Sequence, residues 1–114
     1  MYAIRSLRAL ALAASLSFLV LGVAWAEDAT FTLTIRSHRF EPAELVVPAG
    51  QRIKLILVNA DATPEEFESH SLKREKVIPG GATVVLYLNP LAPGTYEFVG
   101  EFHEDTAKGR LIAK

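Results

Sequence analysis

The sequence contains no cysteine, and Met1 is its only methionine. Without cysteine there is no disulfide framework, and every metal site or nucleophile that depends on a thiolate is excluded. The chain also lacks a GxSxG elbow and a glycine-rich phosphate-binding pattern, so it has no signature of a hydrolase or of a nucleotide-binding protein. The ligands that remain are imidazole and carboxylate groups, which suit divalent copper, zinc or iron.

Long apolar stretches are also scarce, and the single candidate lies at the start of the chain. Two arginines precede the uncharged run Ala9–Val23, which is short for a bilayer span and is followed by the small residues Ala24 and Ala26. This pattern predicts a secretory signal peptide, residues 1–26, cleaved after Ala26, with an uncleaved anchor as the alternative. The mature protein is then expected to be soluble, without a membrane span, and exported, most simply to a bacterial periplasm.

The remaining residues, 27–114, are enough for one small domain and too few for two. They carry ten lysines and arginines against 13 aspartates and glutamates. A slightly acidic chain of this kind argues against nucleic acid or an anionic membrane as the partner.

Apolar and polar side chains alternate with a period of two along most of this domain. The clearest case is Phe31, Leu33 and Ile35, which alternate with threonines. This alternation predicts β-strands, and turn-forming residues separate them at intervals of about ten. We therefore predict an all-β, antiparallel β-sandwich of seven or eight strands. The least regular part is the polar segment Asp61–Lys76, where we expect at most a short strand near Phe67.

Three polar segments are predicted to converge at one end of this sandwich, namely residues 38–42, 60–66 and 100–108. His103 is the strongest candidate ligand because Glu101, Glu104 and Asp105 surround it. A solvated loop histidine is the alternative. If the segments converge, they form one rim that carries histidine and carboxylates together.

A second candidate is the run Glu65-Glu66-Phe67-Glu68. If Phe67 points into the core, Glu66, Glu68 and His70 share the outer face of a strand, and Glu65 shares the inward direction of Phe67. Outward carboxylates are typical of a metal site, but equally of an acidic edge that prevents strand pairing between molecules.

Two further residues are weaker candidates. His38 is followed by Arg39, whose positive charge opposes a bound cation. Glu75 lies between Arg74 and Lys76, so we expect it to form a surface ion pair rather than to bind metal.

Two long segments resemble the small cupredoxins. "FEPAELVVPAGQRIKLILVN" is similar to the first half of these proteins, and "LAPGTYEFVGEFHEDTAKGRLIAK" is similar to their last hairpin with its ligand loop. The resemblance covers nearly all of residues 31–114. It implies a cupredoxin-like Greek-key β-sandwich.

The resemblance also implies where the ligands of a blue copper centre would lie. In the family's CxxHxxxMxG loop, cysteine falls on Gly100, histidine on His103, methionine on Ala107 and the last glycine on Gly109, while the early histidine falls on Glu65. Only one ligand of four is kept. A type 1 blue copper centre is therefore not expected.

Shorter motifs are similar to those of EfeO-type cupredoxin-like proteins of bacterial ferrous-iron uptake: "PEEFES", "REKVIPGG", "PGTYEF" and "GEFHEDTAKG". This resemblance implies a periplasmic accessory that binds copper or iron and acts with periplasmic or inner-membrane iron-uptake components. By this resemblance, the metal-binding candidates are Glu66, Glu68, Glu101 and His103. Glu65 and Glu66 are alternatives for the position beside the family's early histidine ligand.

Three functions remain open from the sequence. The first is a non-blue cupredoxin-like protein that binds a divalent metal, copper or iron, in the service of iron uptake. The second is a metal-free β-sandwich module that docks on a transporter or partner protein. The third, a ferroxidase enzyme, ranks last because turnover with oxygen usually needs more copper than one open site supplies.

Overall fold

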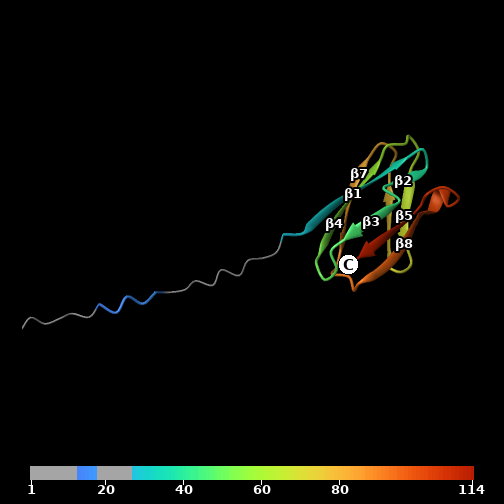
Figure 1. Ribbon diagram of the computed structural model, residues 1–114. Helices are drawn as coiled ribbons and strands as arrows, with labels where there is room; N and C mark the ends of the chain where they lie inside the picture. The colour runs from blue at the N-terminus through green and yellow to red at the C-terminus, as the bar shows by residue number, and fades with distance from the viewer. Residues whose placement is uncertain (1–12, 18–26) are drawn as a thin grey trace, which may run out of the picture.

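The computed structural model describes residues 13–17 and 27–114, and its strands form a two-sheet β-sandwich (Figure 1). The predicted all-β sandwich is confirmed, with nine strands rather than seven or eight among the described residues. The first sheet has the order β2-β1-β4-β7 and consists of β1 (Ala29–Arg36), β2 (Arg39–Glu41), β4 (Ile53–Asn59) and β7 (Thr83–Leu88). The second has the order β3-β9-β8-β5-β6 and consists of β3 (Glu44–Val47), β5 (Glu65–Ser69), β6 (Arg74–Ile78), β8 (Gly94–Gly100) and β9 (Lys108–Ala113). A one-turn 3-10 helix, η1 (Glu101–His103), follows β8.

Two strand pairings are parallel, a detail that the predicted antiparallel sandwich did not include. β1 pairs in parallel with β4, and β3 pairs in parallel with β9. Side chains alternate in the same way in parallel and antiparallel strands, so the period of two does not reveal the direction. Since β3 belongs to the second sheet and β4 to the first, the predicted turn at residues 48–50 connects the two sheets.

The core lies between the two sheets and extends beneath β5. β4 buries every second side chain, as expected for a strand with one face on the core. Three phenylalanines lie together near β5: the ring centroid of Phe98 is 5.1 Å from Phe67 and 4.9 Å from Phe40, and Phe67 is 6.2 Å from Phe40. These rings join β2 of the first sheet to β5 and β8 of the second.

The polar segment after Asp61 contains a hairpin that the sequence predicted only in part. β5 is the expected short strand around Phe67, but β6 was not predicted. β6 lies at the edge of its sheet, and four of its five residues are exposed. Its side chains therefore do not alternate between buried and exposed, which is the pattern used to predict the other strands. The register places Glu75 of β6 opposite Glu68 of β5.

The predicted signal peptide, residues 1–26, lies outside the described residues except for 13–17. Those five residues are exposed and have no regular secondary structure. Within the described parts of the chain, no helix is long and apolar enough to cross a membrane.

Candidate functional site

The three predicted loop segments meet at one end of the sandwich. The hydroxyl of Thr106 donates to the carbonyl oxygen of His38 at 2.6 Å. The imidazole rings of His38 and His103 are stacked, with centroids 3.6 Å apart and planes 11° apart. Asp61, from segment 60–66, accepts hydrogen bonds from the backbone amides of His38 and its neighbour Ser37. The predicted convergence is therefore observed.

Asp61 fixes the turn that carries His38. Its two carboxylate oxygens accept hydrogen bonds from the amides of Ser37, at 2.7 Å, and His38, at 2.9 Å. Both of those residues have positive φ angles, 51° and 55°, a conformation that costs energy outside glycine. The His38 amide is the main cause of the lowered pKa of Asp61, so this carboxylate stays charged and holds the turn.

Glu65 is buried at the centre of this rim, with 1 % of its surface exposed. One carboxylate oxygen accepts hydrogen bonds from the amides of Glu66, at 3.0 Å, and Phe102, at 2.9 Å. The other oxygen lies 2.5 Å from Nδ1 of His103. A buried carboxylate needs such partners, and here they come from β5 and from η1.

The absence of a side chain at Gly100 makes room for the Glu65 carboxylate. A Cβ atom at Gly100 would lie 2.7 Å from Cδ of Glu65 and 2.6 Å from Cβ of Ala107. Glycine at position 100 therefore leaves free the space that the Glu65 carboxylate occupies. The inner part of the rim is filled by the protein's own Glu65 and His103 pair.

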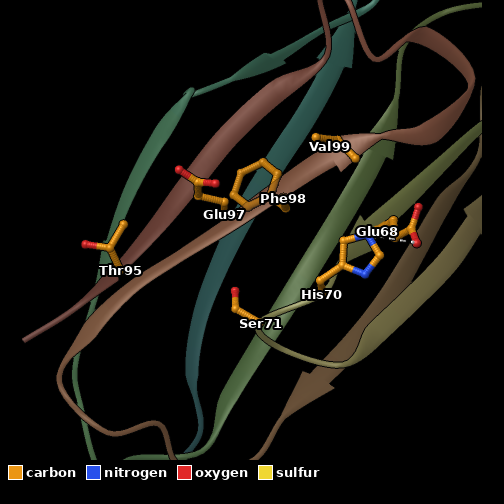
Figure 2. A pocket seen from close by; sticks show the side chains of 7 residues that line it. All are labelled: Glu68, His70, Ser71, Thr95, Glu97, Phe98 and Val99. Carbon is orange, nitrogen blue, oxygen red and sulfur yellow. Dashed lines mark ion pairs between the residues drawn. The ribbon is translucent and has the colours of Figure 1, made fainter.

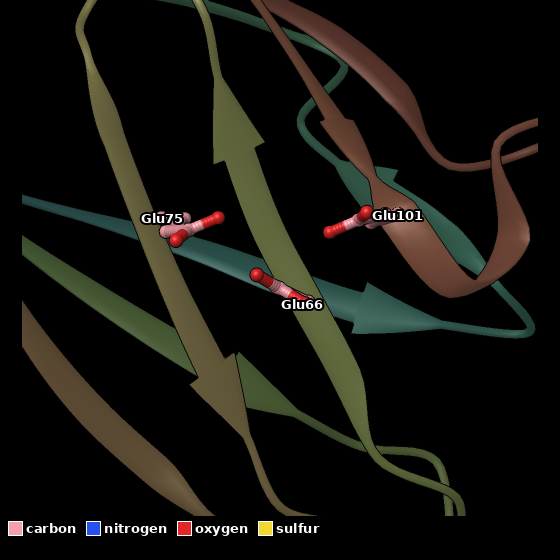
Figure 3. Close-up of side chains that lie close together, drawn as sticks. All are labelled: Glu66, Glu75 and Glu101. Carbon is pink, nitrogen blue, oxygen red and sulfur yellow. The ribbon is translucent and has the colours of Figure 1, made fainter.

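A separate group of carboxylates lies on the outer face of the second sheet. Glu66, Glu75 and Glu101 each offer an oxygen, and these oxygens lie within 4.8 Å of one another. Figure 3 shows the three side chains pointing toward one another from β5, β6 and η1. We call these three residues the carboxylate cluster.

The mutual proximity of these carboxylates changes how they titrate. The pKa of Glu66 is raised to about 7, first by loss of solvation and then by Glu101 and Glu75. The pKa of Glu68 is also raised, by loss of solvation and then by the charge of Glu101. Like charges held this close disfavour full ionisation, and a bound cation relieves that repulsion.

An open hollow of about 390 Å³ lies between β5 and β8, and none of its lining residues belongs to the cluster. Glu68 and His70 lie on its wall, with Nε2 of His70 3.7 Å from a carboxylate oxygen of Glu68 (Figure 2). Glu68 therefore lies between this hollow and the carboxylate cluster. The predicted sharing of one strand face by Glu66, Glu68 and His70 agrees with this arrangement.

The structure divides the predicted ligands into two groups on opposite faces of β5. The inner group consists of Glu65, His103 and His38, and the outer group consists of Glu66, Glu68 and Glu101. A metal ion binds an imidazole nitrogen in the plane of its ring, so the nearly parallel rings of His38 and His103 do not share one ion in these rotamers. The sequence predicted that these candidates lie on one rim, and left open which of them bind the metal.

The ion pair predicted for Glu75, with Arg74 or Lys76, is not observed among the described residues. The guanidinium of Arg74 donates instead to the carbonyl oxygen of Tyr87, at 2.5 Å. Glu75 joins the carboxylate cluster, and a correct pairing of β5 with β6 would have placed it there.

The donor set of the carboxylate cluster fits some metals better than others. Three carboxylates without imidazole or thiolate suit hard cations and Mn(II). Fe(II) follows Mn(II) directly in the general order of affinities of divalent metals for protein sites. A type 1 copper centre does not fit, because no cysteine is present. The ring nitrogen Nδ1 of His103 is already paired with Glu65, which leaves Nε2 as its ligand atom.

Comparison with known proteins identifies the fold and the family. The sequence model of the Cupredoxin-like domain family matches residues 8–113. Two solved structures are examples of the shared fold. Auracyanin A, described as a "blue" copper protein of Chloroflexus aurantiacus, has a TM-score of 0.66 and 17 % identity, over 77 % of this chain and 100 % of that one. The metal-binding domain of the Cu(I)-exporting P-type ATPase CopA of Streptococcus pneumoniae D39 has a TM-score of 0.64 and 16 % identity, over 79 % of this chain and 91 % of that one.

A relative with higher identity is an uncharacterized protein of Rickettsia prowazekii (strain Madrid E). It is 49 % identical over 80 residues, which is 70 % of this chain and 64 % of the relative. The chain thus matches a little less than two thirds of that protein's own length. The family match spans most of the chain, including every strand of both sheets. The chain belongs to the cupredoxin-like domain family.

Proposed function

We propose that this protein binds one divalent metal ion at the carboxylate cluster, without forming a blue copper centre. The observation that carries the proposal is the approach of Glu66, Glu75 and Glu101 to within 4.8 Å of one another. Three acidic groups from three separate elements repel one another unless a proton or a cation lies among them. Glu68 lies on the same face of β5 as Glu66 and adds a further carboxylate next to the cluster.

Between copper and iron, the donor set of the cluster favours ferrous iron. Carboxylate oxygens are hard ligands, whereas copper prefers imidazole or sulfur. The imidazole of His103 belongs to the inner group, on the other side of β5. Copper binding by this protein would instead use Nε2 of His103, so the two metals have distinguishable sites.

An accessory role in bacterial iron uptake, after export to the periplasm, follows as part of this proposal. Its support is the likeness of "PEEFES" and "GEFHEDTAKG" to EfeO-type proteins, together with the signal-peptide pattern of residues 1–26. Periplasmic or inner-membrane iron-uptake components are the expected partners.

Calorimetric titration of the purified protein with Mn(II), anaerobic Fe(II) and Cu(II) tests the metal proposal. We expect one site for Mn(II) and Fe(II), and the double variant Glu75→Gln with Glu101→Gln should weaken it by at least about tenfold, since even residues beyond the ligands commonly have such effects. One control is Glu104→Gln, which removes a single charge from an exposed residue next to η1 but outside the cluster. Combined with Asp105→Asn, it removes the same number of charges as the double variant. His103→Ala should weaken Mn(II) binding less than the double variant does, because His103 is not a member of the cluster.

A metal-free docking module is the second candidate. The observation that favours it is the filled inner rim, where Glu65 pairs with His103, beside the exposed aromatic ring of Phe102. If none of the three metals binds in the titration, this candidate replaces the first.

A further inference from the structure

We propose that Glu65 is a positioning residue that holds Glu101 against Glu66, rather than a metal ligand. The inference rests on the proposed function, because it concerns the same carboxylate cluster. Sequence reasoning treated Glu65 and Glu66 as rivals for one ligand position. The structure gives them different tasks on opposite faces of β5.

Glu65 is badly placed to bind the ion itself. Its side chain points inward, as does that of Phe67, while Glu66 points outward. Both of its oxygens are already occupied: one by the amides of Glu66 and Phe102, the other by Nδ1 of His103. Turning it outward would leave these donors without a partner at a buried position, which is costly.

The contacts of Glu65 link the two segments that carry the cluster. The pairing between β5 and β8 consists of Phe67 with Gly100 and Glu68 with Val99, and the ladder ends there. Beyond Gly100, the chain enters η1, and the amide of Phe102 is held by Glu65 rather than by a strand backbone. Because Phe102 directly follows Glu101, this hydrogen bond fixes the backbone position from which the Glu101 side chain extends.

The same carboxylate holds the other side of the cluster. The amide of Glu66 donates to the oxygen that also accepts from Phe102. One buried atom therefore fixes the backbone next to two members of the cluster. The bond from the other oxygen to His103 ties down the far end of η1.

Two conservative variants separate position from charge. Glu65→Gln loses the negative charge but keeps an oxygen at the same reach, which accepts from both amides. Glu65→Asp keeps the charge, but its side chain is one methylene shorter and withdraws from η1. Positioning predicts that Mn(II) affinity falls about 10- to 100-fold in Glu65→Asp, as for residues behind metal ligands, and stays close to that of the parent in Glu65→Gln. Ligation or simple charge predicts the opposite order.

Ser69→Ala is the matched control for general damage to β5. Ser69 is buried on the same strand and face, but its hydroxyl donates to the carbonyl oxygen of Glu97 at 2.6 Å and does not contact η1. We expect Ser69→Ala to lower the thermal stability while leaving the Mn(II) affinity unchanged. An equal loss of affinity in Ser69→Ala and Glu65→Asp would overturn the proposal, and so would a Glu65→Gln variant that binds no more tightly than Glu65→Asp.

A measurement without metal tests Glu65 independently of the proposed function. The Phe102 amide should exchange with solvent roughly tenfold or more faster in Glu65→Asp than in the parent, because it loses a bond to a charged acceptor. Unchanged exchange would contradict the positioning role even if metal binding is confirmed. If the parent binds no metal but this exchange accelerates as expected, the proposed function fails while the contact between Glu65 and η1 stands.

Discussion

Glu66→Gln is expected to raise the thermal stability of the metal-free protein at pH 8 and to weaken Mn(II) binding by at least about tenfold. The pKa of Glu66 is raised to about 7 from an ordinary value of 4.5. The folded state therefore binds the Glu66 proton more tightly than the unfolded state does. Stability falls as the pH rises from about 4.5 to about 7, and the whole penalty is present at pH 8.

The glutamine variant removes this penalty because its side chain carries no charge at any pH. Thermal unfolding followed by circular dichroism, with a chelator present, should show a higher midpoint than the parent at pH 8 and no difference near pH 4. Glu104→Gln is again the control. A lower midpoint for Glu66→Gln at pH 8 would contradict the repulsion assigned to the cluster.

The same pKa predicts the pH dependence of binding. A cation competes with the proton on Glu66, so Mn(II) affinity should increase from pH 6 to pH 8, with proton release that is larger at pH 6. Titrations in buffers of different ionisation enthalpy measure that release. Affinity that does not change with pH would argue that Glu66 is not a ligand.

Phe67→Ala should lower the free energy of unfolding by about 3–5 kcal/mol, the usual range for a buried phenylalanine. Phe67 is fully buried and lies against Phe40 and Phe98. Small domains have only about 5–15 kcal/mol of stability in total, so this change removes a large share. It also removes the support behind β5, where Glu66 and Glu68 are mounted.

Phe102→Ala is the matched control for that experiment. Phe102 has the same side chain but is 51 % exposed, and its removal should change stability by no more than about 0.5 kcal/mol. Urea unfolding curves measure both variants. A cost below about 1 kcal/mol for Phe67→Ala would mean that β5 is not packed on the core as described.

The orientation of β5 could be predicted from the sequence because the period of two depends only on local geometry. Once Phe67 is taken to point inward, this period correctly places Glu65 inward and Glu66 and Glu68 outward. The direction of strand pairing could not be predicted in this way, so the parallel pairs of β1 with β4 and β3 with β9 were missed.

The residues of the candidate site show the same limit. Two of the three partners of Glu65, Phe102 and His103, lie 37 and 38 positions further along the chain. No local pattern connects them with Glu65. The charged neighbours of Glu75 suggested ion pairs, whereas its position was decided by the unpredicted strand β6. Composition identified which groups can bind metal, but only the sheet register shows which of them meet.

The most direct test of the account is to locate the bound metal ion. Crystals grown with Mn(II) and measured at a wavelength where manganese scatters anomalously should show one peak within bonding distance of oxygens from Glu66, Glu75 and Glu101. The Glu65 side chain should remain inward, paired with His103. A peak at His103, or no peak at a Mn(II) concentration that saturates the protein in solution, would contradict the carboxylate cluster as the metal site.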